Sequence, residues 1–184
     1  MTERGILFSA PMVRALLEDR KTQTRRPMKP QPWKNSVGQW LWGKNHIAFW
    51  PEISNYGPLP SMCPCGKVGD RIWVRETFRT ADGGTIYYRS DHPHDEGPWT
   101  PSIHMPRRAS RITLEITDVR VQRVQNISGD DCVAEGIVVT DAMRHNEGRY
   151  EWGEFGRQWE SIYGLGSWER NDWVWALTFK VVKA

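Results

Sequence analysis

The chain has 184 residues, a formal net charge of +3 and a pI of about 8.8. Its length suffices for one domain with a hydrophobic core, and its charge is too small for a protein that coats nucleic acid. No apolar run approaches about 18 residues, so we expect no transmembrane helix. Three cysteines, an odd number, argue against a disulfide framework and indicate a cytoplasmic protein.

The beginning of the chain predicts a strand, a helix and a second extended segment. Residues 5–8 form the strand, and Ser9 can cap a helix that carries Pro11 in its first turn. Apolar side chains then recur at helical spacing, and the helix should end near Arg20. Residues 22–28 read as extended.

A long insertion follows at about residues 29–68. A segment of this length in a compact domain is usually functional or contains short elements. The chain has 11 tryptophans, far above ordinary usage, and four of them lie here: Trp33, Trp40, Trp42 and Trp50. Tryptophan fills cores and also stacks on nucleobases, and both roles remain open for these four.

Strands dominate the middle of the chain. Residues 71–77 and 85–89 read as short strands, and residues 110–124 form the clearest one. The apolar alternation of this last strand changes parity near Thr117 and Asp118. Such a change predicts a β-bulge.

The C-terminal third predicts two helices and a final strand. Ser128, with Asp131 three residues later, predicts a short helix that ends at Glu135. The apolar spacing between residues 152 and 162 predicts another helix, and residues 173–182 alternate as a strand.

Together these elements indicate an α+β protein. About five to six short strands with irregular connections suit a small barrel-like sheet, flanked by about three helices. No internal repeat is visible, so we expect one domain over residues 1–184, with insertions at about 29–68 and 138–150.

The most unusual polar cluster lies at residues 20–26, which contain four cations and two threonines. It can bind an anion, or it can supply a nucleophile with its base. Thr24 is a poor nucleophile until a base takes its proton, and Lys21 can be that base only if its pKa falls below about 10.4. Burial and the neighbouring arginines both lower a lysine pKa. A solvated basic turn after a helix is the alternative.

Glu135 is a second candidate, at the predicted C-terminus of the short helix. A negative side chain there faces the negative end of the helix dipole, and such an unfavourable placement sometimes marks a working acid. An exposed glutamate, or one paired with an arginine, is the ordinary alternative.

Cys63 and Cys65 resemble half of a zinc site. No second pair of ligands follows at a suitable spacing, and a structural zinc site normally needs four protein ligands. A turn is therefore the favoured interpretation, and we expect neither a metal nor another cofactor.

Several segments together resemble the ASCH domain (activating signal cointegrator homology) of the wider PUA-like group. Residues 6–9, the following helix and residues 20–26 resemble its start, and residues 69–76 resemble its glycine-aspartate strand motif. Residues 127–137 are similar to its short helix with an acidic end, and residues 173–182 to its closing strand. The longer form, with residues 102–106 and 166–168, resembles ASCH proteins encoded by bacteriophages and prophages.

The resemblance implies a PUA-like β-barrel with a cleft for RNA or a nucleobase. Some small bacterial members are amidohydrolases that remove the acetyl group from N(4)-acetylcytidine. Carried over to the matching positions, Thr24 attacks the acetyl carbonyl, Lys21 accepts its proton and Glu135 protonates the leaving amine. A charged Glu135 raises the pKa of Lys21, so the scheme works more easily if Glu135 starts protonated or if the two groups titrate as a pair.

The expected ligand is a nucleoside, a nucleotide or RNA. The expected binding residues are Arg20, Arg25 and Arg26, together with Trp73 and Arg75 of the strand motif. These arginines carry more positive charge than the binding of a neutral nucleoside requires, which favours a ligand with phosphate. Two alternatives share this cleft: a non-catalytic RNA or modified-base binding module, and a metal-independent ribonuclease.

Overall fold

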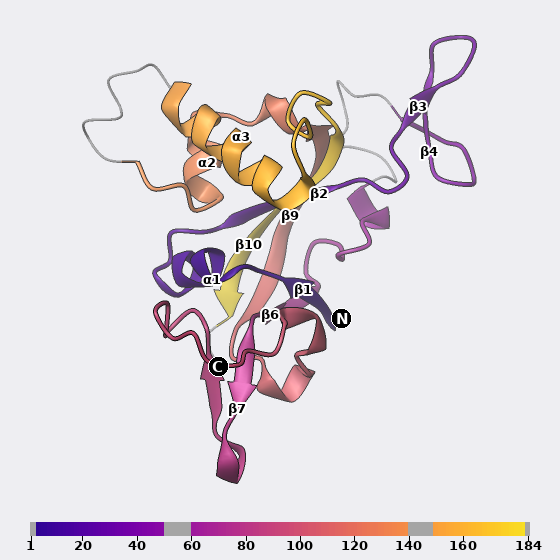
Figure 1. Ribbon diagram of the computed structural model, residues 1–184. Coiled ribbons are helices and arrows are strands. Elements are labelled where there is room, and N and C mark those ends of the chain that lie inside the picture. The colour runs from indigo at the N-terminus through magenta and orange to yellow at the C-terminus, as the bar shows by residue number, and fades with distance from the viewer. Residues whose placement is uncertain (1–2, 50–59, 140–148, 183–184) are drawn as a thin grey trace.

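A mixed five-stranded sheet organises the fold (Figure 1). Its strands follow the order β1-β6-β9-β10-β2, with β1 parallel to β6 and the other neighbours antiparallel. The computed structural model describes residues 3–49, 60–139 and 149–182. The strands of the sheet are β1 (Glu3–Leu7), β2 (Gln23–Pro27), β6 (Arg71–Arg75), β9 (Thr113–Arg123) and β10 (Trp173–Val182).

The described residues include three α-helices, so the predicted α+β class is confirmed. They are α1 (Ala10–Leu17), α2 (Gly129–Ala134) and α3 (Arg149–Tyr163). Helices α2 and α3 lie side by side at one end of the sheet, with α1 below them in Figure 1. Short 3₁₀ helices lie in the connections: η2 (Pro60–Met62), η3 (Asp82–Gly84), η4 (Ser102–His104), η5 (Arg107–Ala109) and η6 (Val124–Asn126).

Strand β10 separates two hydrophobic clusters. Trp175 and Leu177 belong to the larger cluster, which includes the apolar face of α1. Val174 belongs to the smaller cluster, together with Phe155 and Trp159 of α3. Successive side chains of a strand point to opposite faces, so burial on both faces explains the nearly continuous apolar sequence of β10.

The predicted β-bulge in β9 is confirmed. Asp118 pairs with Thr178 and Ile116 pairs with Phe179, so Thr117 is an extra residue opposite β10. The bulge resets the alternation, and residues on either side of it, Ile116 and Val119 among them, are buried in the same cluster.

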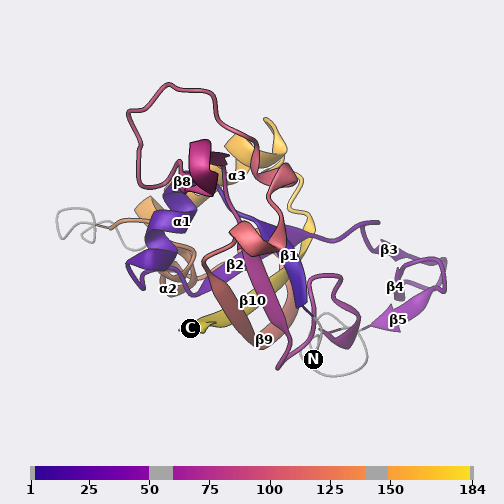
Figure 2. The same cartoon turned by 90° about the horizontal axis from the view of Figure 1, so that it is seen from below.

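The insertion at 29–68 contains a small sheet made of β3 (Trp33–Lys34), β4 (Trp40–Trp42) and β5 (Ile47–Phe49). It projects from one side of the molecule in both Figure 1 and Figure 2. Edge-to-face contacts fix it to the core, with ring centroids 5.3 Å apart for Trp40 and Trp173 and 5.4 Å apart for Trp42 and Trp175. Trp33 stays partly exposed, and Trp50 lies outside the described residues.

A second projection is the hairpin of β7 (Phe78–Thr80) and β8 (Ile86–Tyr88). Most of the second expected insertion, residues 140–148, lies outside the described part of the chain. In the described segments, no helix is long and apolar enough to cross a bilayer.

The sheet is open rather than closed into a barrel. Strands β1 and β2 are its edges, and no ladder joins them within the described ranges. The Arg26 side chain links the two edges, because its guanidinium, from β2, donates a hydrogen bond of 2.7 Å to the Leu7 carbonyl of β1.

Candidate functional site

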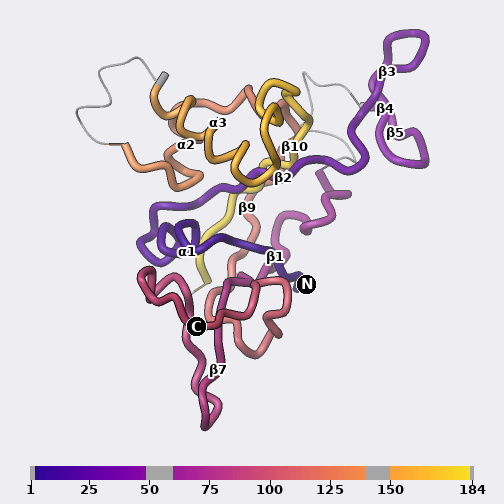
Figure 3. Tube along the Cα trace, viewed as in Figure 1, coloured from indigo at the N-terminus to yellow at the C-terminus, as the bar shows by residue number. Residues whose placement is uncertain are grey.

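The backbone after α1 brings the basic segment against the end of α2. The N–H groups of Arg20 and Lys21 both donate to the Ala15 carbonyl, at 2.9 and 3.0 Å, and this ends the helix. Thr22 N then donates to the Ala134 carbonyl at 2.8 Å. Figure 3 shows the two segments running next to each other, although they are far apart in the sequence.

A glycine permits this close approach. Gly136 follows α2 with a φ of +97°, a conformation that side chains rarely adopt. A Cβ at this position would lie 3.0 Å from the Ala15 Cβ and 3.5 Å from the Lys21 Cβ. The turn after α2 is therefore packed directly against the turn after α1.

Lys21 and Glu135 form a buried ion pair at this junction. The Lys21 ammonium donates to Glu135 Oε2 at 2.7 Å and to the Glu135 backbone carbonyl at 2.7 Å. The residues are 1% and 4% exposed, respectively. The unfavourable position of a glutamate at a helix C-terminus is thus compensated by a cation that also binds the last carbonyl of that turn.

Arg25 completes the charge balance of the pair. Its guanidinium lies 3.1 Å from Glu135 Oε1 and 2.7 Å from Asp131 Oδ2. Gln23 donates to the other Asp131 oxygen at 2.8 Å. Two buried cations therefore meet two carboxylates in one network, which is how a folded chain tolerates buried charge.

Burial lowers the pKa of Lys21, although the Glu135 carboxylate opposes this shift. The positive charges of Arg26 and Arg25 also lower it. The direction is the one that a lysine base requires.

Thr24 lies in the same region but has a different partner. Lys21 precedes β2, whereas Thr24 and Arg26 share one face of that strand at a spacing of two. Arg26 Nη1 donates to Thr24 Oγ1 at 2.7 Å. The Phe8 ring packs against both cations, with its centroid 5.7 Å from Lys21 Nζ and 5.2 Å from Arg26 Cζ. Thr24 is completely buried.

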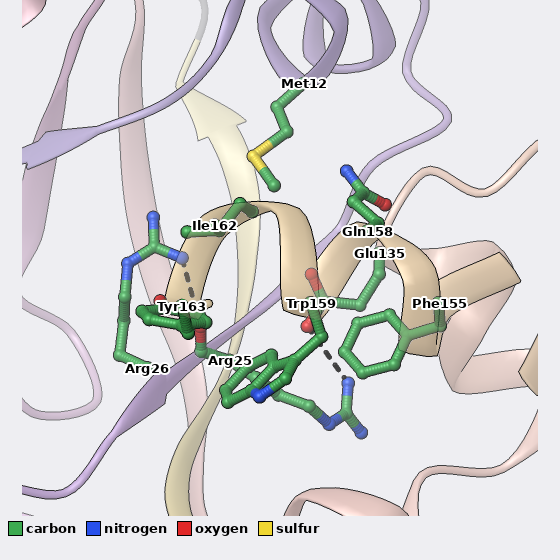
Figure 4. A pocket seen from close by; sticks show the side chains of 9 residues that line it. All are labelled: Met12, Arg25, Arg26, Glu135, Phe155, Gln158, Trp159, Ile162 and Tyr163. Atoms are coloured by element: carbon green, nitrogen blue, oxygen red, sulfur yellow. Dashed lines mark hydrogen bonds and ion pairs between the residues drawn. The ribbon is translucent and has the colours of Figure 1, made fainter. Parts of the chain in front are cut away.

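A small pocket opens onto this network from the side of α3 (Figure 4). Charged side chains of Arg25, Arg26 and Glu135 line it, as do aromatic and apolar ones. Lys21 and Thr24 do not line it. The remaining lining residues are Met12, Phe155, Gln158, Trp159, Ile162 and Tyr163.

The pocket has a volume of about 20 Å³, room for about one water molecule. A groove of about 520 Å³ adjoins it and shares Met12, Arg26, Ile162 and Tyr163 with it. Ligand sites commonly measure about 300–1,000 Å³, so the groove, not the pocket, has the size of a nucleoside site.

Trp159 presents an unused hydrogen-bond donor beside the pocket. Its Nε1 is buried and has no hydrogen-bond partner among the described residues. Most buried polar atoms are paired, so this donor is available to an acceptor that enters the pocket. Burial also raises the pKa of Tyr163 on the next turn of α3, so its phenol stays a neutral donor.

The other expected binding residues lie elsewhere. Arg20 pairs with Glu18 and does not line the pocket or the groove. Arg75 lies over the Trp73 ring, with Cζ 5.4 Å from its centroid, and donates to the Ile103 carbonyl. Trp73 and Arg75 are therefore separate from the Lys21–Glu135 pair, whereas Arg20 contacts the turn after Glu135, where its Nη1 donates to the Gly136 carbonyl at 3.3 Å.

Sequence reasoning missed several residues of this region. The sequence places Phe8 in a strand, Asp131 in a helix cap and Trp159 in a helix. It indicates no role for Tyr163. Residues two apart in a strand lie on the same face, so the spacing of Thr24 and Arg26 predicts their contact. The contacts from α3 join distant parts of the chain and leave no local pattern.

The described residues contain no group of three or more His, Cys, Asp and Glu side chains placed to hold a metal ion. Cys63 and Cys65 lie in a turn, as expected, and both are free thiols.

Comparison with known proteins returned no match among family models, curated proteins or solved structures.

Proposed function

We propose that this protein hydrolyses an N-acyl group on a modified nucleoside or nucleotide of the N(4)-acetylcytidine type. We also propose that it is an ASCH-like protein whose open sheet is a variant of the PUA-like barrel. The observation that carries the functional proposal is the buried Lys21–Glu135 pair, whose carboxylate lines a pocket beside a nucleoside-sized groove. In this arrangement the nucleoside occupies the groove, and the pocket must widen, through a shift of the Arg26 side chain, before the acyl group can enter it and reach Thr24.

The ion pair can supply both the base and the acid. The scheme requires transfer of one proton from Lys21 to Glu135, which gives a neutral amine and a carboxylic acid without changing the net charge, and burial favours the neutral amine. Lys21 then accepts the proton of Thr24 while Oγ1 attacks the acyl carbon. Arg26 already donates to Oγ1 and stabilises negative charge on it.

The second half of the reaction releases the deacylated nucleobase. Glu135 gives its proton to the leaving amine as the C–N bond breaks, and the acyl group stays on Thr24 as an ester. Water then hydrolyses the ester and restores Thr24 and the ion pair. Because Thr24 is covered by Arg26, the scheme requires the Arg26 side chain to shift when substrate binds.

The test is incubation of purified protein with N(4)-acetylcytidine and its 5′-monophosphate, followed by chromatography of the products. We expect cytidine and acetate from the wild type, and a loss of at least about 100-fold in kcat for Lys21→Met, Thr24→Val and Glu135→Gln. Arg20→Ala is the control and should retain activity, since Arg20 lies outside the pocket. Equal rates in Thr24→Val and the wild type would exclude Thr24 as the nucleophile.

One observation favours a binding module as the second candidate. Both Glu135 oxygens are paired with cations and Thr24 Oγ1 accepts from Arg26, so the acceptor atoms of these two side chains are satisfied without substrate. A binding module would retain its affinity for modified nucleosides or RNA in Thr24→Val and release no acetate from any of them.

A further inference from the structure

The segment Cys63-Pro64-Cys65-Gly66 forms a tight turn against the sheet. Gly66 N donates to the Cys63 carbonyl at 3.1 Å, which closes the turn. Gly66 has a φ of +131°, and a Cβ there would lie 3.0 Å from Ile116 Cδ1. A Cβ at this position would crowd Ile116, and the positive φ is one that side chains rarely adopt, so glycine is the residue that suits this turn.

This turn places two thiols next to each other. The two thiols lie at positions i and i+2 of this turn, close enough for each to affect the pKa of the other. Cys63 is 3% exposed, whereas Cys65 is half-buried and packs in part against the core. A disulfide requires Cα atoms about 4.4–6.8 Å apart, a separation that residues i and i+2 of a turn can reach.

The surroundings of the turn are positively charged. Arg4 Nη1 donates to the Pro64 carbonyl at 3.2 Å. The pKa of Cys65 is lowered to about 7, mainly by the hydrogen bond from Cys63 and further by the charges of Arg26 and Arg4, against the effect of burial. The same hydrogen bond and burial raise the pKa of Cys63.

We propose that Cys65 and Cys63 form a redox-active dithiol in which Cys65 is the nucleophile toward hydroperoxides and Cys63 is the resolving thiol. The Cys65 thiolate attacks one peroxide oxygen, so that an S–O bond forms, the O–O bond breaks and hydroxide leaves. Cys63 then attacks the sulfenic acid, an S–S bond forms, and the Cys63 proton leaves with the hydroxyl as water. The leaving hydroxide takes up the proton that Cys65 gave up, so two thiols are oxidised to one disulfide and one hydrogen peroxide is reduced to two waters.

The dithiol lies next to the candidate site but does not depend on the proposed hydrolysis. The negative charge of Cys65 acts on Arg26 and Tyr163, which line both the pocket and the groove. Disulfide formation removes this charge. Oxidation therefore changes the electrostatic potential around Arg26 without altering any pocket residue.

The experiment uses the full chain in its reduced form, exposed to one equivalent of hydrogen peroxide, alkylated with N-ethylmaleimide and mapped with trypsin. Residues 45–67 form one tryptic peptide that contains both cysteines. We expect this peptide to become two hydrogens lighter and to lose both alkyl groups. In Cys63→Ser the sulfenic acid at Cys65 should persist and be trapped by dimedone.

Cys132 is the internal control, because it is fully buried and burial raises its pKa to about 12. We expect alkylation of Cys65 to be at least about 100-fold faster than that of Cys132 in the folded protein, and its rate to level off by about pH 8. The proposal is overturned if Cys63 reacts first, if Cys132 reacts as fast as Cys65, or if peroxide oxidises only methionine. The variant Cys65→Ser shows which cysteine reacts first. It should abolish the fast phase of alkylation while the protein stays folded.

Discussion

Lys21 Nζ lies 2.7 Å from Glu135 Oε2, although 114 positions separate the two residues in the sequence. The pair joins the end of α1 to the end of α2, and both side chains are almost completely buried. It therefore contributes to stability as well as to the proposed chemistry.

Glu135→Gln should destabilise the protein because it leaves Lys21 and Arg25 buried with one carboxylate fewer. Loss of one partner of a buried pair costs about 3–5 kcal/mol, and we expect a decrease of about 3 kcal/mol in the free energy of unfolding. Urea denaturation measures this. The double variant Lys21→Met/Glu135→Leu should recover part of the loss, because it removes both charges. A single variant as stable as the exposed control Arg20→Ala would show that the pair is not strongly coupled.

The stability contribution of Lys21 should rise with pH. Burial places the pKa of folded Lys21 below its ordinary value of 10.5, so between these two values the unfolded chain binds more protons than the folded one. The free energy of unfolding then increases with pH across this window and levels off above 10.5. The check is to measure urea unfolding of wild type and Lys21→Met from neutral pH to that value. The free energy of unfolding should rise more steeply with pH in the wild type than in Lys21→Met. A difference that falls with pH would mean that the ion pair raises the pKa of Lys21.

Ile162→Ala should widen the route into the pocket. Ile162 lines both the pocket and the groove and is 47% exposed, so its truncation costs little stability. If the proposed function holds, we expect the ratio of kcat/KM for N(4)-butyrylcytidine to that for N(4)-acetylcytidine to rise by about tenfold. Val133→Ala is the matched control, since Val133 is similarly exposed but lines neither cavity. An equal change in both variants would argue against the pocket as the acyl site.

Deletion of Thr117 should be severely destabilising, whereas Thr117→Ala should be nearly neutral. Without the extra residue, the part of β9 before or after the bulge must shift by one position, which moves its buried side chains to the opposite face. Ile116 and Val119 can then no longer lie in the same cluster. Thermal unfolding of both variants tests this, and a deletion variant that melts like wild type would show that the sheet tolerates the register change.

Local patterns predicted much of the fold. The bulge at Thr117, the cap at Ser128 and the strand over residues 173–182 are each set by neighbouring residues, and the structure has all three, although the first five residues of β10 are all buried and do not alternate. The small β3–β5 sheet was expected only as unspecified short elements, because strands of two or three residues give too little periodicity.

The candidate site was harder to predict. The resemblance to ASCH domains, not any spacing, linked Lys21 to Glu135. It did not show that Arg26 is the partner of Thr24, nor that α3 closes the pocket with Trp159 and Tyr163. These contacts depend on how distant segments pack, and composition carries no information about that.

The pairing of the arginines has a consequence for how ionic strength affects ligand binding. Arg20 is neutralised by Glu18, and Arg25 by Asp131 and Glu135, whereas the partners of Arg26 within the described residues are uncharged oxygens. A phosphate entering the groove thus displaces the counterions of about one cation, not three. For a single-stranded RNA, the logarithm of the binding constant should fall with the logarithm of salt concentration with a slope near about −0.7, a shallow dependence for so basic a segment.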